Sequence, residues 1–195
     1  MIKYIFIHNS AVSLVQPDQL SNINEFHRQQ FNMKSSLGYW VGYNALMDAW
    51  GNVVTCRTDG EETAAVAGHN TDSLHICLVG NFDNEYPTTN QRHALRAWLK
   101  TKMSLHNIPP ENVKGHRWAD SAKAQGKTCP GRYLTDKEIF EMADWARQEK
   151  EAKEKYELAE KTRKETEEKM KSAMTKLIEL LQLKVEELLK LLKLK

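Results

Sequence analysis

The stretch IKYIFIH, residues 2–8, predicts the first β-strand of the fold. β-branched and aromatic residues dominate this run, which is typical of a β-strand. The run LHICLVG, residues 74–80, is almost wholly apolar and predicts a second strand that is buried on both faces. A Gly-Asn pair at Gly51 lies between two extended runs and predicts a hairpin. The run VKGH, residues 113–116, predicts a further short strand.

Segments with helical periodicity separate these strands. Apolar side chains recur at helical spacing over residues 19–31. Residues 87–106 and 135–148 are also predicted helices, and each contains a Thr followed three positions later by Gln or Glu, the spacing of a capping box. Strands interleaved with helices predict an α/β fold with a single mixed β-sheet flanked by helices.

The bulk composition limits the classes of function. The 195 residues carry a formal net charge of +2, so charge gives no reason to expect a nucleic acid partner. Three cysteines, Cys56, Cys77 and Cys129, are an odd number, which excludes a complete disulfide framework. The N-terminus has neither the apolar stretch nor the small-residue cleavage site of a signal peptide. We therefore expect the chain to start out in the cytoplasm of the producing cell.

The composition changes sharply along the chain. No Gly or Pro follows Gly131, Lys and Glu dominate residues 147–176, and Leu dominates residues 177–195. We therefore predict a globular domain over residues 1–146 and a long C-terminal helical extension over residues 147–195.

The Leu-rich end of the extension has an apolar face that is too wide to stay exposed on a monomer in water. A 3,4 repeat typical of a coiled-coil seam is formed by Ile178, Leu181, Val185, Leu188 and Leu192. The face is widened by Leu177, Leu180, Leu191 and Leu194. One interpretation is a homo-oligomer that forms a helical bundle through residues 170–195. The other is an amphipathic helix on a membrane surface, with these lysines at the head groups: Lys184, Lys190, Lys193 and Lys195. Docking against the globular domain is a third arrangement.

Three residues have the types and positions of metal ligands. His8 ends the first strand, His116 ends the short strand VKGH, and Cys129 lies in a loop before a Pro-Gly pair. Two imidazoles and a thiolate suit Zn²⁺, and three protein ligands leave the fourth position to water. The alternative is a loop histidine and a buried free cysteine with no metal. Spacing alone does not decide between the two.

Five stretches appear together in an order that resembles one known family. They are YIFIHNSAVS (4–13), GYNALMDAWGNV (42–53), NTDSLHICLVGNFD (70–83), VKGHRWAD (113–120) and GKTCPG (126–131). Together they resemble the zinc-dependent N-acetylmuramoyl-L-alanine amidases, a family that includes the small lysozyme of T7-like phages and the peptidoglycan recognition proteins. The resemblance covers residues 1–146. It implies cleavage of the amide bond between N-acetylmuramic acid and the L-alanine of the peptidoglycan stem peptide.

The resemblance also implies roles for individual residues. His8, His116 and Cys129 match the zinc ligands of the family. Tyr43 matches a tyrosine that stands beside the zinc water, and Lys127 matches a lysine needed for amidase activity. A Lys ammonium or a Tyr hydroxyl suits such a site because either can stabilise the oxyanion formed during amide hydrolysis.

Further residues are candidates for the substrate groove. His69 lies where family members line the groove, and Asn70 is a candidate for the groove or for a turn. Trp40 lies near Tyr43, where it could stack on a glycan. The alternative for each is an ordinary packing or loop residue. His75 departs from the family, in which a small residue is usual at this position. Its side chain could face the groove or be covered by the domain.

Two expectations concern the surroundings of these residues. Trp118 stands where many relatives have an aspartate, which makes Asp120 the candidate carboxylate partner of His116. His27 lies in a helical segment and is interpreted as an ordinary surface or interface histidine.

The resemblance favours a phage endolysin that leaves the producing cell and acts on the cell wall. A bacterial amidase for wall recycling or remodelling is one alternative. A non-catalytic peptidoglycan receptor is another, but such members typically lack the zinc cysteine, so Cys129 favours the enzyme. A third alternative places the function in the coiled coil and makes the globular domain a targeting module.

Overall fold

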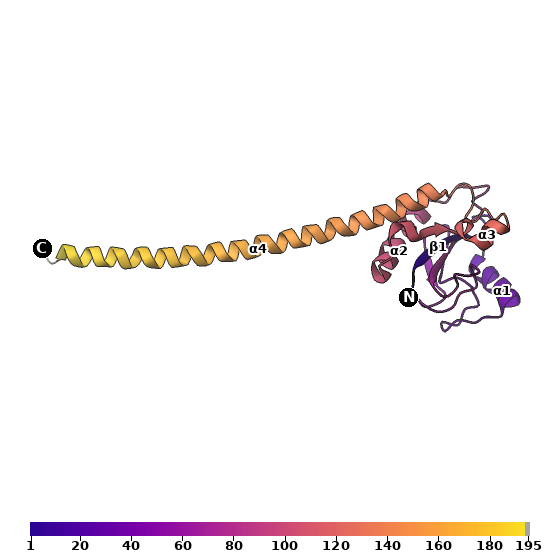
Figure 1. Cartoon of the computed structure of the whole chain (residues 1–195), viewed down its shortest axis with the longest axis horizontal. Coiled ribbons are helices and arrows are strands. Elements are labelled where there is room, and N and C mark those ends of the chain that lie inside the picture. Colours follow the sequence, from indigo (N-terminus) through magenta and orange to yellow (C-terminus); the bar gives the residue numbers. More distant parts are fainter. Residues whose placement is uncertain (194–195) are drawn as a thin grey trace. The chain divides into compact units, whose positions relative to one another are not determined.

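A mixed β-sheet lies among helices in the N-terminal part of the chain, in a computed structural model that describes residues 1–193 (Figure 1). Its five strands lie in the order β3-β2-β4-β1-β5. Their bounds are β1 (Tyr4–Asn9), β2 (Ala45–Met47), β3 (Val53–Thr55), β4 (Ser73–Leu78) and β5 (Val113–Gly115). β2, β4, β1 and β5 are parallel to one another, whereas β3 pairs antiparallel with β2 at one edge. The predicted fold class, a single mixed sheet accompanied by helices, is therefore confirmed.

The α-helices of the described residues are α1 (Gln19–Phe31), α2 (Thr89–His106), α3 (Asp120–Ala124) and α4 (Asp136–Lys193). Two 3-10 turns, η1 (Pro110–Asn112) and η2 (His116–Trp118), flank β5. Both predicted capping boxes form. The Thr88 side chain accepts from the backbone N–H of Gln91, and the Thr135 hydroxyl accepts from that of Glu138 at 3.2 Å. The sequence did not predict α3 or the two turns, because such short segments contain no full period of apolar residues.

The two faces of the sheet have different chemistry. One face forms the main apolar core with α2 and the first turns of α4, and its members include Ile5, Ile7, Leu74, Ile76, Leu95, Leu99 and Ile139. The opposite face carries Phe6, His8, His75 and Cys77, which are also buried. Because successive side chains of a strand point to opposite faces, β1 and β4 contribute to both layers. The apolar face stabilises the sheet, and the opposite face carries the polar side chains.

A buried arginine anchors the loop that precedes β2. The Arg57 side chain is 1% exposed, and its Nε donates to the carbonyl oxygen of Val41 at 2.7 Å. Its other N–H groups donate to the carbonyl oxygens of Met33 and Glu62. Because buried carbonyl groups require hydrogen-bond partners, this guanidinium fixes the backbone just before Tyr43.

The helix α4 begins in the core and continues as the predicted extension. Ile139, Met142 and Ala146 in its first turns are buried. Contacts divide the chain into two units, Met1–Glu149 and Lys150–Lys195.

Within the second unit, the large apolar side chains between residues 170 and 192 are each at least 50% exposed. No helix among residues 1–193 is long and apolar enough to cross a membrane. Leu194 and Lys195, which the sequence places on the apolar face and at the head groups, lie outside the described residues. Self-association or membrane binding through this apolar face stays a prediction.

Asp59 ties a loop to α2. Its carboxylate accepts from Lys102 Nζ at 2.6 Å and lies 2.7 Å from His106 Nε2. Burial raises the pKa of Asp59, but the hydrogen bonds from Lys102 and His106 outweigh burial and lower the pKa overall. A carboxyl group whose pKa is lower in the folded state stabilises the fold above its unfolded pKa of 3.8, and this stability is lost as the pH falls through the folded pKa.

We predict that Asp59→Asn lowers the free energy of unfolding at pH 7 by about 1–3 kcal/mol, because it removes charge-assisted hydrogen bonds. The difference between the two proteins should shrink at acidic pH, where the native Asp59 also becomes neutral. Urea unfolding of both proteins over a series of pH values measures the effect. A difference that stays constant from neutral to strongly acidic pH would contradict the assignment.

Candidate metal centre

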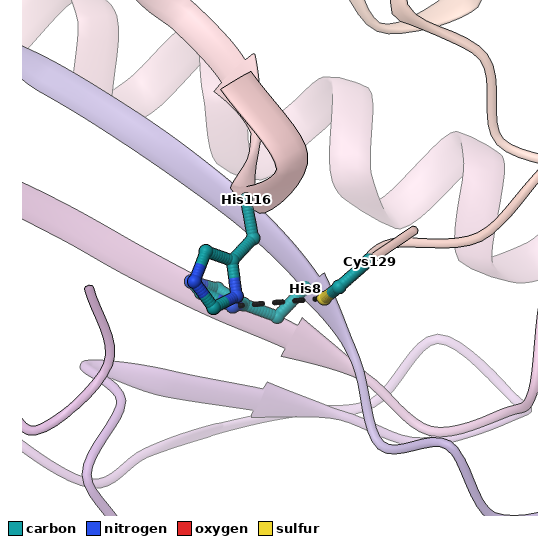
Figure 2. A group of neighbouring side chains, drawn as sticks. All are labelled: His8, His116 and Cys129. Carbon is teal, nitrogen blue, oxygen red and sulfur yellow. Dashed lines mark hydrogen bonds between the residues drawn. The ribbon is translucent and has the colours of Figure 1, made fainter. Parts of the chain in front are cut away.

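Three side chains from separate elements converge at one edge of the sheet. His8 lies near the end of β1, His116 begins η2 directly after β5, and Cys129 lies in the loop between α3 and α4. One ligand atom from each of the three lies within 4.8 Å of the other two. Figure 2 shows the three side chains close together, with His8 Nδ1 and Cys129 Sγ 3.9 Å apart. Two atoms bound to one tetrahedral zinc lie roughly 3.5 Å apart, so the cluster is close to the size that zinc requires.

Burial sets the ionisation of the three ligands. It lowers the pKa of His8 well below the usual range, with further lowering by His116, His75 and Lys127. Burial also lowers the pKa of His116 to about 4, with further lowering by Lys127. Both imidazoles are therefore neutral near pH 7 and keep a lone pair for a metal. Burial also raises the pKa of the Cys129 thiol to about 11. A bound cation would stabilise the thiolate, so the donor set fits Zn²⁺.

Arg117 follows the proposed ligand His116 and holds the loop that carries the proposed ligand Cys129. Its backbone N–H donates to the carbonyl oxygen of Cys129 at 2.7 Å. Its guanidinium donates to the carbonyl oxygens of Thr128, Gly131 and Leu134. No sequence pattern singled out Arg117 as a functional residue; its position next to His116 was the available signal.

Gly131 allows the same loop to approach a neighbouring segment. Its φ is +105°, and a Cβ at this position would lie 2.4 Å from the backbone carbon of Phe82. Only glycine fits such a contact without a backbone shift. The Cys-Pro-Gly stretch therefore requires its glycine for steric reasons.

Tyr43 lies beside the cluster. Its ring centroid is 4.9 Å from that of His8, and burial raises its pKa well above the usual value. Its hydroxyl is therefore protonated at neutral pH and can donate a hydrogen bond. It lines a cavity of about 390 Å³ together with Ser10, Val12, Asn22, Ile23, Phe26, His27 and Cys77. The lining includes Tyr43 but none of the three candidate ligands, so the cavity lies between Tyr43 and α1.

Lys127 is exposed in the loop that leads to Cys129. Its positive charge contributes to the lowered pKa of both His8 and His116, after the larger effect of burial. An ammonium group at this position adds positive potential to the site without being buried.

The three groove candidates have different surroundings. His69 Nδ1 lies 3.1 Å from the Asp72 carboxylate, and the His69 ring contacts the ring of Trp118. The Asn70 side-chain oxygen accepts from two backbone N–H groups of its own loop. Trp40 is half-buried, and Lys34 Nζ lies 5.6 Å from its ring. Substrate contacts by these three residues stay predictions.

Two expectations about neighbouring residues were wrong. His27 is 6% exposed, and its Nδ1 accepts from the backbone N–H of Gly42 at 2.8 Å. It is therefore a buried structural histidine, whose side of α1 faces the domain. Asp120 has a 99% exposed side chain that pairs with Lys123, so it points into solvent and is no partner of His116.

Comparison with known proteins places this site in a family. The family described as N-acetylmuramoyl-L-alanine amidase matches residues 1–132. The chain belongs to this family. The match includes His8, His116 and Cys129, and it ends before α4 begins.

Relatives of this chain include peptidoglycan recognition proteins. Peptidoglycan-recognition protein SC2 of Drosophila melanogaster is 28% identical over 151 residues, which covers 74% of this chain and 76% of the relative. An uncharacterised protein of Haemophilus influenzae is 33% identical over 107 residues, which covers 51% of this chain and 90% of the relative.

Two solved structures share the fold. The amidase LysC from Clostridium intestinale has a TM-score of 0.58 at 24% identity and covers 71% of this chain and 82% of its own. The Ph2119 endolysin of a Thermus scotoductus bacteriophage has a TM-score of 0.57 at 21% identity, with coverage of 73% and 84%. The architecture of the sheet and its helices is thus shared with an amidase and with a phage endolysin.

We predict that Cys129→Ser removes stoichiometric zinc from the purified protein, because a serine hydroxyl is a much poorer ligand than a thiolate. Metal analysis after dialysis measures the loss, and the unfolding temperature checks that the fold is retained. Cys56→Ser is the matched control, since Cys56 is a buried free cysteine whose sulfur donates to the Val54 carbonyl oxygen and is not part of the candidate ligand cluster. Equal zinc content in Cys129→Ser and the unaltered protein would refute the ligand assignment.

Proposed function

We propose that the protein is a zinc-dependent peptidoglycan amidase that cleaves the bond between N-acetylmuramic acid and the L-alanine of the stem peptide. The observation that carries this proposal is the convergence of His8, His116 and Cys129 in a member of the amidase family. The recognition proteins among the relatives support peptidoglycan as the ligand.

The three ligands would hold Zn²⁺ and leave one position open for water or substrate. When bound, Zn²⁺ would supply Lewis acidity, which polarises a carbonyl group and lowers the pKa of bound water to about 7. The protein's own task is then to bind the substrate, orient its amide and stabilise the charge that develops on the carbonyl oxygen.

Tyr43 and Lys127 suit this task in different ways. The raised pKa of Tyr43 keeps its hydroxyl protonated, so it serves as a hydrogen-bond donor to a developing oxyanion or to the leaving amine. Lys127 carries a positive charge near His8 and His116 and stabilises negative charge in the transition state. We assign Lys127 to the oxyanion and Tyr43 to proton handling.

We predict that Tyr43→Phe and Lys127→Ala each lower kcat by about 10²–10³-fold while zinc content stays unchanged, as expected for donors that act on the transition state. Release of stem peptides from purified wall, followed by mass spectrometry, measures the rate. Lys123→Ala, which changes an exposed lysine on α3, is the control. Free peptides that begin with L-alanine identify the amide bond that is cleaved. Wild-type activity in both variants would contradict the assigned roles.

The alternatives predict different products. A non-catalytic peptidoglycan receptor would bind wall fragments and release no peptide. A recycling or remodelling amidase would prefer soluble muropeptides, whereas a phage endolysin would degrade intact sacculi. We propose the endolysin, made in the cytoplasm and acting on the wall after release, because an amidase with intact ligands and a compact catalytic unit suits that role.

For the extension we propose self-association through residues 170–195. Apolar side chains in the 3,4 repeat are at least half exposed in the described part of this segment, and burial between helices would remove this surface from water. The membrane-surface interpretation is the competing outcome.

We predict that Leu181→Lys lowers the mass measured by light scattering at several protein concentrations, because it places a charge in the seam. Leu183→Lys is the matched control. Leu183 is exposed to a similar extent, 65% against 56%, but lies outside the repeat. A monomeric unaltered protein at every concentration would exclude self-association, and leakage of anionic lipid vesicles would then favour the membrane.

A further inference from the structure

The second ring nitrogen of His8 faces another histidine. His8 Nδ1 is directed at Cys129, and His8 Nε2 lies 3.2 Å from Nδ1 of His75. A neutral imidazole that binds a metal through one nitrogen carries its proton on the other. That proton needs an acceptor, which in most metal sites is a carboxylate, a carbonyl oxygen or water. Here the acceptor is an imidazole nitrogen.

The surroundings of His75 determine which of its nitrogens carries the proton. His75 Nε2 lies 3.3 Å from the backbone carbonyl oxygen of His69. A carbonyl oxygen can only accept, so Nε2 must be the N–H group and Nδ1 must hold the lone pair. This lone pair then accepts from His8 Nε2–H. The chain of hydrogen bonds leaves the lone pair of His8 on Nδ1, the nitrogen that faces Cys129.

The opposite tautomer is incompatible with metal binding. If His75 carried its proton on Nδ1, it would donate to His8 Nε2 and its own Nε2 would face the carbonyl lone pairs of His69. His8 would then carry its proton on Nδ1, where the metal must bind. The His69 carbonyl thus selects the state of His8 through His75.

His75 is held rigidly enough to act in this way. Its side chain is fully buried, and its ring stacks on Phe6 with centroids 5.5 Å apart and planes at 9°. Two hydrogen bonds from Asn44 hold the His75 backbone. Asn44 Oδ1 accepts from the His75 N–H at 2.8 Å, and the Asn44 N–H donates to the His75 carbonyl oxygen at 2.9 Å. His75 pairs with Phe6 across β1 and β4, so it lies diagonally beside His8 on the same face.

We propose that His75 is a positioning residue for the metal: it fixes the tautomer and the orientation of His8 so that the His8 Nδ1 lone pair points to the ion. This inference rests on the metal site of the proposed function. It assigns no contact between His75 and the ion or the substrate.

The first test reads the tautomers directly in the full-length protein without metal. Long-range ¹H–¹⁵N correlation spectra distinguish the two nitrogens of each neutral imidazole. The proposal expects His8 and His75 both to carry the proton on Nε2. A proton on Nδ1 of either residue would overturn it. This measurement requires neither a variant nor activity.

The second test compares zinc affinity in the full-length protein by competition with a chelating dye. His75→Phe keeps a ring next to Phe6 but removes the acceptor, and should weaken zinc binding about 10–100-fold. His75→Asn places an amide oxygen near the former Nδ1 position and should restore affinity close to that of the unaltered protein. Unfolding temperatures of both variants control for loss of the fold.

The outcomes separate the two proposals. If His75→Phe binds zinc as tightly as the unaltered protein, the positioning role is wrong and the metal site stands. If His75→Asn is as weak as His75→Phe in a folded protein, the hydrogen bond is not the cause and the positioning role is also wrong. If the unaltered protein binds no zinc, the metal site of the proposed function fails, and the inference fails with it.

Discussion

Parallel pairing of β1 with β4 and β5 is the constraint on which the site depends. Parallel strands present their carboxyl ends at the same edge of a sheet, so His8 at the end of β1 and His116 after β5 meet although they are far apart in the chain. A one-residue shift in the register of β1 would move His8 to the apolar face and destroy the cluster. The apolar side chains of β1, which alternate with Phe6 and His8, oppose that shift because they would leave the core.

Electrostatics explains why this buried cluster suits a cation. The ligand set contains two neutral imidazoles and a thiol whose pKa is raised by burial. An isolated buried thiolate would be costly, and a divalent ion compensates it. The His8–His75 hydrogen bond adds to this effect. The N–H group at His8 Nε2 has a fixed acceptor, so the lone pair at His8 Nδ1 stays available for a cation.

The sequence predicted the elements with strong periodicity and the ligand set, but few of their supporting contacts. Residues 19–31 correspond to α1, and both capping boxes form, because these signals are local. The convergence of His8, His116 and Cys129 was expected from a family resemblance, since spacing alone could not decide it. The roles of Arg57, His27 and His75 depend on which backbone group each side chain meets after folding, and no local pattern encodes that.

The hydrogen bonds between Arg117 and the Cys129 loop bear on how the proposed metal ion would bind. The backbone and guanidinium of Arg117 hold this loop beside His116, so contacts within the chain itself keep the proposed ligands near one another. A site held in this way would lose less conformational entropy when a metal binds, which would favour tighter binding. If Zn²⁺ binds as proposed, it would enter a site whose backbone is already held by the protein's own hydrogen bonds.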